Sequence, residues 1–494
     1  MKNKNFIILS ICLLCSFHAM EAKHITLTLD QAISMASDSS LSSFEAKNSY
    51  MASYWAYKSF KANRLPSLDF VTMPIYYQRS FVSRYDSQND IDLYRSQKSY
   101  YASGGLEVSQ NLDFTGGTFY VQSDLDYLKY YGASNSKQFS SVPIKIGYSH
   151  STLGFNAFKW DKQIEPLKYK KAKKQLIYNL QNIAVQTTNY FFALASAQVS
   201  YNINKEKIIS STTLYEQGLK RNKIACISKE DLLTLKLDVV NAKNSFRSSQ
   251  KNLDRAMSNL ISYLNLNEKD TVNVVLPEAL KNLKIDENKA LEMVLKNNPD
   301  FIDDKTNVLE AEKTLEKTIK TSRMQASINA SIGFNQVASN LLDSYNNLLE
   351  QDIVSISLTI PILDWGERKG KRNMAANNLN VIKLQVEQSE QSIQKDVTMT
   401  VRDFNDQQDM INSAKYALEI ADLAYSTTEE RFKIGEADIS SLTLAQNRKE
   451  TAKTNYIQIL EDYWVGYYKL RKLTLYDFDM NLPLSFEFET LYKF

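Results

Sequence analysis

Apolar and aromatic residues recur every seven positions over two long stretches of this 494-residue chain, and this spacing limits the fold more than any other feature. The first stretch has Leu180, Leu194, Tyr201, Ile208 and Tyr215, with Thr187 at the remaining position, and the second has Val397, Phe404, Ile411, Leu418 and Tyr425. A sustained seven-residue period indicates helices that supercoil on neighbouring helices. We therefore predict helices over 156–220 and 366–431, each about 100 Å long at a rise of roughly 1.5 Å per residue.

The two stretches belong to two copies of one plan. A shift of 210 residues aligns Tyr215, Arg221 and Lys223 with Tyr425, Arg431 and Lys433. Nearer the start of each copy the shift is 258 residues, which aligns 31–36 with 289–294. Unequal shifts indicate an insertion in the first copy. We expect a first repeat over 23–266, a linker over 267–288, a second repeat over 289–476 and a tail over 477–494. Each repeat has the order helix, strands, long helix, turn and helix.

Short segments of strict alternation lie between the helices. Val354, Ile356, Leu358 and Ile360 share one face of a predicted strand over 353–361, and the serines and threonine between them share the other. A second such segment is 328–336, and the first copy offers 68–80, 101–112, 118–128 and 142–151. Alternation over about ten residues is typical of transmembrane β-barrels, although a soluble antiparallel sheet has the same pattern. We predict membrane strands within 68–151 and 326–361.

The amino-terminal residues predict a secretory signal peptide over 1–22, with Lys2 and Lys4 before a short apolar run and Ala22 at the cleavage site. Cys12 and Cys15 raise a lipoprotein alternative, which we disfavour because neither has a small residue before it. Cleavage leaves Cys226 as the only cysteine. No later segment has 18 consecutive apolar residues, so a membrane crossing by this chain has to use strands.

Four or six strands are too few to close a membrane barrel, because the smallest has eight. Open sheet edges are not tolerated in lipid, so we expect a barrel shared between copies of the chain. The Gly116-Gly117 turn predicts an additional hairpin in the first copy. The polar segments 83–99 and 131–141 are expected to be external loops.

Composition argues against several other functions. The formal net charge of +3 is too balanced for a nucleic-acid-binding surface. The mature chain would hold only His24 and His150, so histidine-based catalysis and zinc sites are not expected. We predict no enzyme activity, no cofactor and no metal site.

The order of motifs resembles the TolC family of outer-membrane efflux proteins. The family's tip signature is similar to 431–470, which begins RFKIGEADISSLTLAQ, and more weakly to 221–246. The starts of the copies (27–36 and 285–301), RLPSLDF (64–70), GFNAFKW (154–160) and PILDWGERKGKRNMA (361–375) also match it. The resemblance covers nearly the whole mature chain.

The resemblance implies an α/β membrane protein: a trimeric β-barrel continuous with a long α-helical periplasmic barrel, with two internal structural repeats per chain. It implies an exit duct in the outer membrane of a Gram-negative bacterium, spanning into the periplasm. The implied partners are two sister subunits, outer-membrane lipid, a periplasmic adaptor protein and an inner-membrane pump of the RND or ABC type. The trimer would have 18 strands if the additional hairpin enters the barrel and twelve if it folds over the rim. The alternative is a barrel-anchored coiled-coil structural protein or adhesin.

The resemblance places the turns near 221–229 and 432–438 at the periplasmic tip. Gly435 supplies the left-handed backbone of the second turn, Asp438 is the expected cap of the next helix, and in the first copy Ala225 replaces the glycine while Ser228 is the expected cap. The family's two tip aspartates correspond here to Ser441 and Leu444, so that double ring is absent. Asp231, Glu230, Glu436 and Asp438 are candidates for an acidic entrance, with helix capping as the alternative. The candidate adaptor contacts are Arg221, Lys223, Ala225, Arg431, Lys433 and Gly435.

Overall fold

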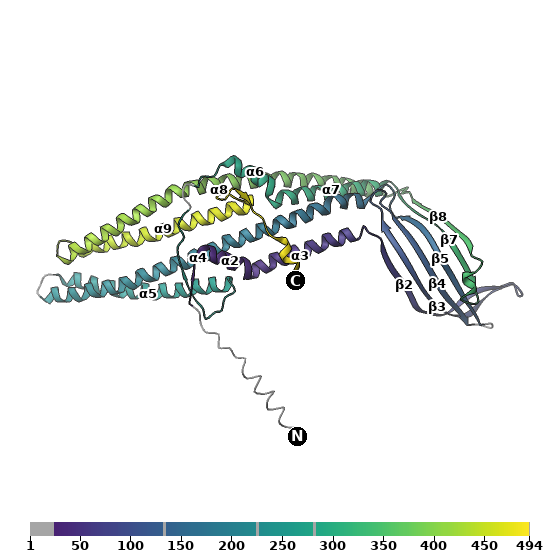
Figure 1. Ribbon diagram of the computed structural model, residues 1–494, viewed down its shortest axis with the longest axis horizontal. Helices are drawn as coiled ribbons and strands as arrows, with labels where there is room; N and C mark the ends of the chain where they lie inside the picture. The colour runs from purple at the N-terminus through teal and green to yellow at the C-terminus, as the bar shows by residue number, and fades with distance from the viewer. Residues whose placement is uncertain (1–23, 132–134, 224–226, 280–282, 494) are drawn as a thin grey trace, which may run out of the picture. The chain divides into compact units, whose positions relative to one another are not determined.

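The computed structural model describes residues 24–131, 135–223, 227–279 and 283–493, so the predicted signal peptide, Ala225 and Cys226 lie outside it. The chain divides into two compact units. A helical unit contains 24–51, 173–299 and 391–493, and a sheet unit contains 52–172 and 300–390. The elements of each unit are labelled in Figure 1.

Eight helices make up most of the described chain. They are α2 (Leu29–Ser39), α3 (Leu41–Ala62), α4 (Ala157–Lys223), α5 (Lys229–Tyr263), α6 (Glu287–Asn297), α7 (Pro299–Arg323), α8 (Glu367–Lys433) and α9 (Ile439–Thr474). The predicted long helices are α4 and α8, each of 67 residues and ending within three residues of the expected bounds. Thr28 and Gln31 cap the start of α2 reciprocally, which satisfies two backbone N–H groups that have no partner within the helix.

The residues of the seven-residue period form the core of the helical unit. Thr187, Leu194, Val397 and Phe404 are buried, and the Phe404 ring stacks on Tyr463 with the ring centroids 4.9 Å apart. This burial confirms that the stripes on α4 and α8 face neighbouring helices.

A short parallel pair of strands joins distant parts of the helical unit. β1 (His24–Leu27) pairs with β6 (Thr271–Val274), and Leu27 and Val272 are buried with Leu194 and Leu260. The segment 267–288, which we interpreted as a linker, therefore carries a strand of the core. The segment after α9 contains β9 (Tyr476–Asp477), β10 (Leu482–Pro483) and the 3₁₀ helix η2 (Phe488–Lys493).

The sheet unit contains one antiparallel sheet of six strands in the order β2-β3-β4-β5-β7-β8. The strands are β2 (Ser67–Asp86), β3 (Ile91–Asn111), β4 (Thr118–Tyr131), β5 (Ser136–His150), β7 (Gln325–Ala338) and β8 (Leu349–Thr359). The hairpin β3–β4, which contains the additional segments of the first copy, lies within the sheet. A short 3₁₀ helix, η1 (Asp343–Tyr345), lies between β7 and β8.

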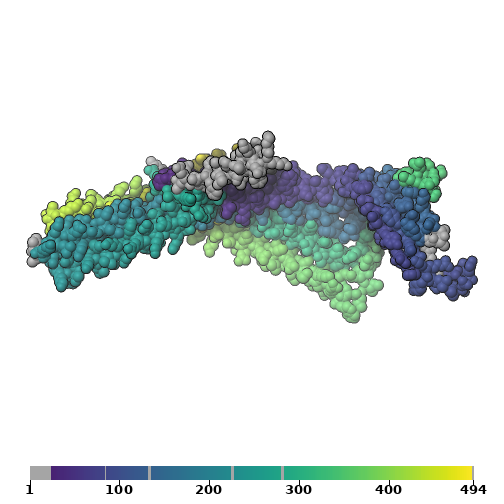
Figure 2. Space-filling view, turned by 90° about the horizontal axis from the view of Figure 1, so that it is seen from below, coloured from purple at the N-terminus to yellow at the C-terminus, as the bar shows by residue number. Residues whose placement is uncertain are grey.

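Two expected loops are largely strand. The prediction of an external loop over 83–99 is wrong, because β2 continues to Asp86 and β3 begins at Ile91. Likewise, much of 131–141 belongs to β5. Backbone pairing in an antiparallel ribbon does not require apolar side chains. The strands therefore continue through these polar segments. The far ends of β2 and β3 project beyond the rest of the sheet (Figures 1 and 2), since β4 pairs with β3 only as far as Lys98.

The sheet has one apolar face and one polar face. A cross-strand register joins Phe70 to Leu106 on the apolar face, and it joins Asp69 to Glu107, Glu107 to Gln122 and Gln122 to Lys145 on the polar face. Phe70 and Leu106 are both more than half exposed. The two edges, β2 and β8, each have one side without a strand partner in the described chain.

Candidate functional site

The turn between α8 and α9 has the geometry that the sequence predicted. Gly435 has φ +85°, its N–H donates to the Phe432 carbonyl at 3.1 Å, and the Glu436 N–H donates to the Arg431 carbonyl at 2.9 Å. These two bonds define a Schellman motif with glycine at its left-handed position. Asp438 then caps α9 by accepting a hydrogen bond from the Ser441 N–H at 2.7 Å. The chain thus reverses within a few residues.

The turn between α4 and α5 uses a different cap. The Ser228 hydroxyl accepts from the Asp231 N–H at 3.0 Å, and the Asp231 carboxylate accepts from the Ser228 N–H at 3.2 Å. This capping box confirms Ser228 as the cap. The Asn222 amide donates to the Ile227 carbonyl at 3.0 Å, which also ties the two sides of the turn together.

The four acidic candidates are exposed, and three of them have local partners. Asp231 and Asp438 cap helices, and hydrogen bonds from Ser441 lower the pKa of Asp438. The Glu436 carboxylate lies 3.8 Å from the Arg431 guanidinium. Glu230 is exposed in the first turn of α5, where the helix dipole favours a negative charge. The capping interpretation therefore accounts for two of the four without a role in ion selection.

Ser441 and Leu444 occupy the first turns of α9, and both are exposed. The Ser441 N–H is used by the cap, and Leu444 presents about half of its surface to solvent. Neither side chain has a negative charge, so the structure provides no acidic pair at these positions of the second turn.

Basic residues at the tips contact both turns. Arg221 lies over the Phe432 ring, 5.6 Å from its centroid, and Phe432 is buried. Lys433 pairs with Glu429 at 3.1 Å, whereas Lys223 is exposed. The Arg221–Phe432 contact joins the end of α4 to the end of α8, so the two turns form one tip. Next to this contact, α4, α8 and α9 line an open pocket of about 290 Å³, whose lining includes Ile209, Thr213, Tyr425 and Phe432.

Two exposed apolar stripes run along helices of the helical unit. On α5 the stripe consists of Leu233, Leu237 and Val240, and on α8 it consists of Tyr416, Ile420 and Leu423. Each has the spacing i, i+4, i+7, which places its members on one face of a helix. All six side chains are about half exposed or more. Contiguous apolar surface of this kind is typical of a protein–protein interface.

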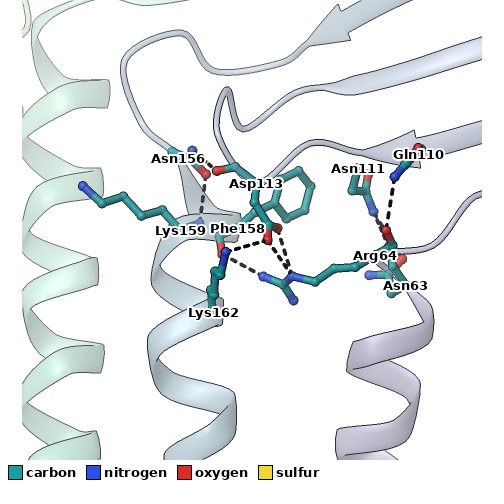
Figure 3. Close-up of polar contacts among 9 residues, drawn as sticks. All are labelled: Asn63, Arg64, Gln110, Asn111, Asp113, Asn156, Phe158, Lys159 and Lys162. Carbon is teal, nitrogen blue, oxygen red and sulfur yellow. Dashed lines mark hydrogen bonds and ion pairs between the residues drawn. The ribbon is translucent and has the colours of Figure 1, made fainter.

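A polar cluster at the junction of the sheet with its helices was not singled out from the sequence (Figure 3). Arg64, two residues after α3, contacts Asp113 in the β3–β4 turn at 2.9 Å and donates to the Phe158 carbonyl in α4 at 2.8 Å. The Asn156 amide donates to the Asp113 carbonyl at 2.7 Å. Arg64 begins the RLPSLDF motif, so the sequence did mark this residue. Its partners could not be predicted from the motif, because they are 49 and 94 residues away in the chain.

The side chains predicted to face lipid lie on the apolar face of β8, except for Ile360, which directly follows the strand. Val354, Ile356, Leu358 and Ile360 are between 52% and 74% exposed. Their neighbours across β7 are also apolar, since Val354 pairs with Ala330 and Ile356 with Ile328. In the described part of the chain, no helix is long and apolar enough to cross a membrane, and no cluster of His, Cys, Asp or Glu has the composition of a metal site.

The comparisons with solved structures show which proteins share this fold. The outer membrane channel CmeC of Campylobacter jejuni is 13% identical, with a TM-score of 0.66 over 94% of this chain and 88% of that chain. The outer membrane protein VceC of Vibrio cholerae is 13% identical, with a TM-score of 0.60 over 91% and 96%. The open-state MtrE outer membrane channel of Neisseria gonorrhoeae is 14% identical, with a TM-score of 0.59 over 92% and 89%. No curated protein matches the sequence significantly.

The fold is thus that of outer-membrane channels. Residues 290–474, from α6 to the end of α9, match the outer membrane efflux protein family. The match over this segment agrees with the resemblance to TolC-like proteins that the order of motifs predicted. The family match also supports the prediction of an outer-membrane efflux channel that is not an enzyme. The adhesin alternative has no support from the family or the fold.

Proposed function

We propose that the chain forms the exit duct of a tripartite efflux or type I secretion system and conducts substrates passively to the outside. The observation that carries this proposal is the six-stranded sheet, which has one exposed apolar face, one polar face and two edges without a strand partner among the described residues. Such a sheet is stable in lipid only when its edges are closed. In this proposal Val354, Ile356, Leu358 and Ile360 face lipid and the polar face lines the duct.

The edges are closed by two sister subunits in a homotrimer. β2 of one copy pairs with β8 of the next, which repeats around a threefold axis as a heterologous interface. The stripes on α5 and α8 support the same arrangement in the helical unit, because each is apolar and lacks a cover within the described chain. Three copies then form a helical barrel that continues from the membrane barrel into the periplasm.

Six strands in one sheet give 18 strands in a trimer, and their stagger fits the tilt of a membrane barrel. One cross-strand row runs from Ser67 in β2 through Ser109, Tyr120, Gly147 and Ser331 to Ile353 in β8. Ser67 begins its strand, whereas Ile353 lies six residues before the end of β8. A shift of six residues over five steps between strands corresponds to a tilt of about 40°, taking roughly 3.3 Å per residue and about 4.8 Å per step. Membrane barrels have tilts of about 35–45°.

The partners follow from the proposed duct. A periplasmic adaptor docks at the tip formed by the two helical turns, where Arg221, Lys223, Ala225, Arg431, Lys433 and Gly435 are the proposed contacts. An inner-membrane pump supplies the energy. Glu230, Asp231, Glu436 and Asp438 contribute negative charge around the entrance.

The two halves of the chain act as structural repeats. Both have a 67-residue helix, α4 or α8, followed by a capped helix of 35 residues in α5 or 36 in α9. The proposed repeats cover 23–266 and 289–476, and the residues 1–22 are removed as a signal peptide after export.

Conductance in a planar bilayer tests the duct. We expect the purified trimer to give uniform steps that increase when the tip is loosened. A protein that stays silent even after removal of the Arg221–Phe432 contact by R221A would favour an anchored structural protein. Crosslinking through Cys226, identified by mass spectrometry, tests the adaptor, and recovery of no envelope partner would contradict the tip assignment.

A further inference from the structure

Four basic residues lie on the apolar face of the sheet near its far end, away from the helices. They are Arg79 on β2, Lys98 on β3, Lys129 on β4 and Lys137 on β5. Side chains of an antiparallel pair that are directly opposite point to the same face. The register pairs Arg79 with Lys98, and it pairs Lys129 with Lys137. Lys98 and Leu106 are an even number of residues apart on β3, so the basic residues share the face of Leu106.

The four positions lie at one level of the sheet. Each lies eleven to thirteen residues from the end of its strand nearest the helices. The distances are twelve residues from Ser67 to Arg79, thirteen from Asn111 to Lys98, eleven from Thr118 to Lys129 and thirteen from His150 to Lys137. Twelve residues at about 3.3 Å, tilted by about 40°, rise roughly 30 Å. The apolar band of a membrane barrel is about 25 Å tall. The basic residues therefore lie just beyond its outer boundary.

Aromatic side chains mark the same boundary. Tyr100 lies opposite Lys129, and Tyr127 lies opposite Phe139 one step closer to the apolar band. Tyr127 has its ring centroid 6.1 Å from Tyr100 and 5.0 Å from Phe139. Girdles of aromatic residues are found at the interfaces of membrane barrels. This girdle places the four cations at the level of lipid headgroups.

The protein does not neutralise these charges within the described chain. None of the four basic residues forms an ion pair with a carboxylate there, although Lys129 lies 4.8 Å from the centroid of the Tyr131 ring. Like charges directly opposite each other, as in Lys129 and Lys137, destabilise an antiparallel pair. The acidic residues of this face of β8, Glu350 and Asp352, lie two strands away from Lys137. A bound anion would remove the repulsion.

We propose that Arg79, Lys98, Lys129 and Lys137 bind the phosphate groups of the phosphorylated glycolipid in the outer leaflet. This inference rests on the proposed function, because it requires the apolar face to meet lipid. The four cationic side chains would donate charge-assisted hydrogen bonds to the phosphate groups at the level of the headgroups. The acyl chains of the same lipid would cover the apolar face of the sheet next to them. The site would hold the lipid against four adjacent strands, including the additional hairpin.

Binding of bis-phosphorylated lipid A to the full-length trimer tests the site. Native mass spectrometry of trimers in detergent with added lipid A would count the bound molecules. The variant K98Q/K129Q/K137Q should weaken binding at least about tenfold, which corresponds to about 1.4 kcal/mol. The variant K98R/K129R/K137R should retain it, because it keeps the charges. Arg79 stays unchanged, since it is on the edge strand that meets the next copy.

Lys137 and Lys145 provide a matched pair on β5, because they lie on opposite faces. K137Q should weaken lipid A binding and K145Q should not. Equal binding of lipid A by the triple glutamine variant and the unchanged protein would overturn the proposal, and so would equal binding of dephosphorylated lipid A. Conductance of the same samples separates the two questions: trimers that conduct but do not bind lipid A refute only this site, whereas silent trimers that bind it refute only the duct.

Discussion

The guanidinium of Arg64 lies 2.9 Å from the carboxylate of Asp113, and this ion pair joins the end of α3 to the turn between β3 and β4. Arg64 also lies over the Phe60 ring, 3.9 Å from its centroid, and Lys162 of α4 approaches the same carboxylate at 3.6 Å. The additional hairpin is therefore held at the helix end of the sheet by Arg64, directly after α3, and by Lys162 of α4. A hairpin that folded over the far rim would not reach these partners.

Replacing Arg64 should loosen this junction. R64A removes the ion pair and the hydrogen bond to Phe158, and we expect a loss of about 2 kcal/mol, since hydrogen bonds to charged groups contribute about 1.5–3 kcal/mol each before solvent exposure reduces them. R64K keeps the charge but not the planar fork, so its loss should be intermediate. Heat-induced dissociation of the trimer measures both. Equal stability of R64A and the unchanged protein would contradict the role of the cluster.

Substitution of Gly435 should destabilise the tip because of the left-handed backbone conformation of this residue, and not because a side chain would clash. A Cβ at Gly435 would meet no atom within 4 Å, but φ +85° is unfavourable for other residues by about 1–2 kcal/mol. We expect G435A to destabilise the tip by that amount, as seen by faster hydrogen exchange over 431–446. Gly370 in α8 is the control, since it is also uncrowded but helical. G370A should stabilise α8 by about 0.5–1 kcal/mol.

The cap of α9 should weaken in acid. The hydrogen bonds from Ser441 lower the pKa of Asp438, so the ionised cap stabilises the folded tip above the ordinary carboxyl pKa. This contribution is lost as the pH falls through the lowered pKa. The protection of the first turn of α9 against hydrogen exchange, relative to D438A at the same pH, should therefore decrease from neutral pH to about pH 3, below the ordinary value of about 3.9. D438N should show no such decrease.

The stripe on α5 should be required for assembly. L237D places a charge in the centre of an exposed apolar stripe, so it should convert trimers to monomers if a sister subunit covers that face. Lys236 is the adjacent exposed residue of α5, and K236D should leave the trimer intact. Analytical ultracentrifugation in detergent distinguishes the two. A trimeric L237D variant would show that the stripe is not an interface.

The two faces of β8 should respond differently to a charge. V354K places lysine on the apolar face, where a cation in the middle of the membrane costs about 2–4 kcal/mol. S355K places the same residue on the polar face and should fold normally, while shifting the ion selectivity of the duct towards anions. Folding into lipid vesicles, measured by heat-modifiable gel migration, compares the two. Similar folding of both variants would argue against a lipid-facing surface on β8.

The sequence by itself determined the long helices, the alternating faces of the strands and the chemistry of the turns. These features are local: the seven-residue period of α4 and α8, the alternation at Val354 and Ile356, and the caps at Ser228 and Asp438 depend on neighbours within a few residues. The order of the motifs also predicted the resemblance to outer membrane efflux proteins, with which the match over 290–474 agrees.

Only the tertiary structure decided how far β2 and β3 extend, that the additional hairpin enters the sheet, and which basic residues share one level of it. Strand pairing joins residues such as Lys129 and Lys137 through a register that depends on bulges and on every strand between the edges. The partners of Arg64 are likewise remote in the chain. Such contacts form only when strands that are distant in the sequence pair in one register. A pattern of neighbouring residues does not determine which register that is.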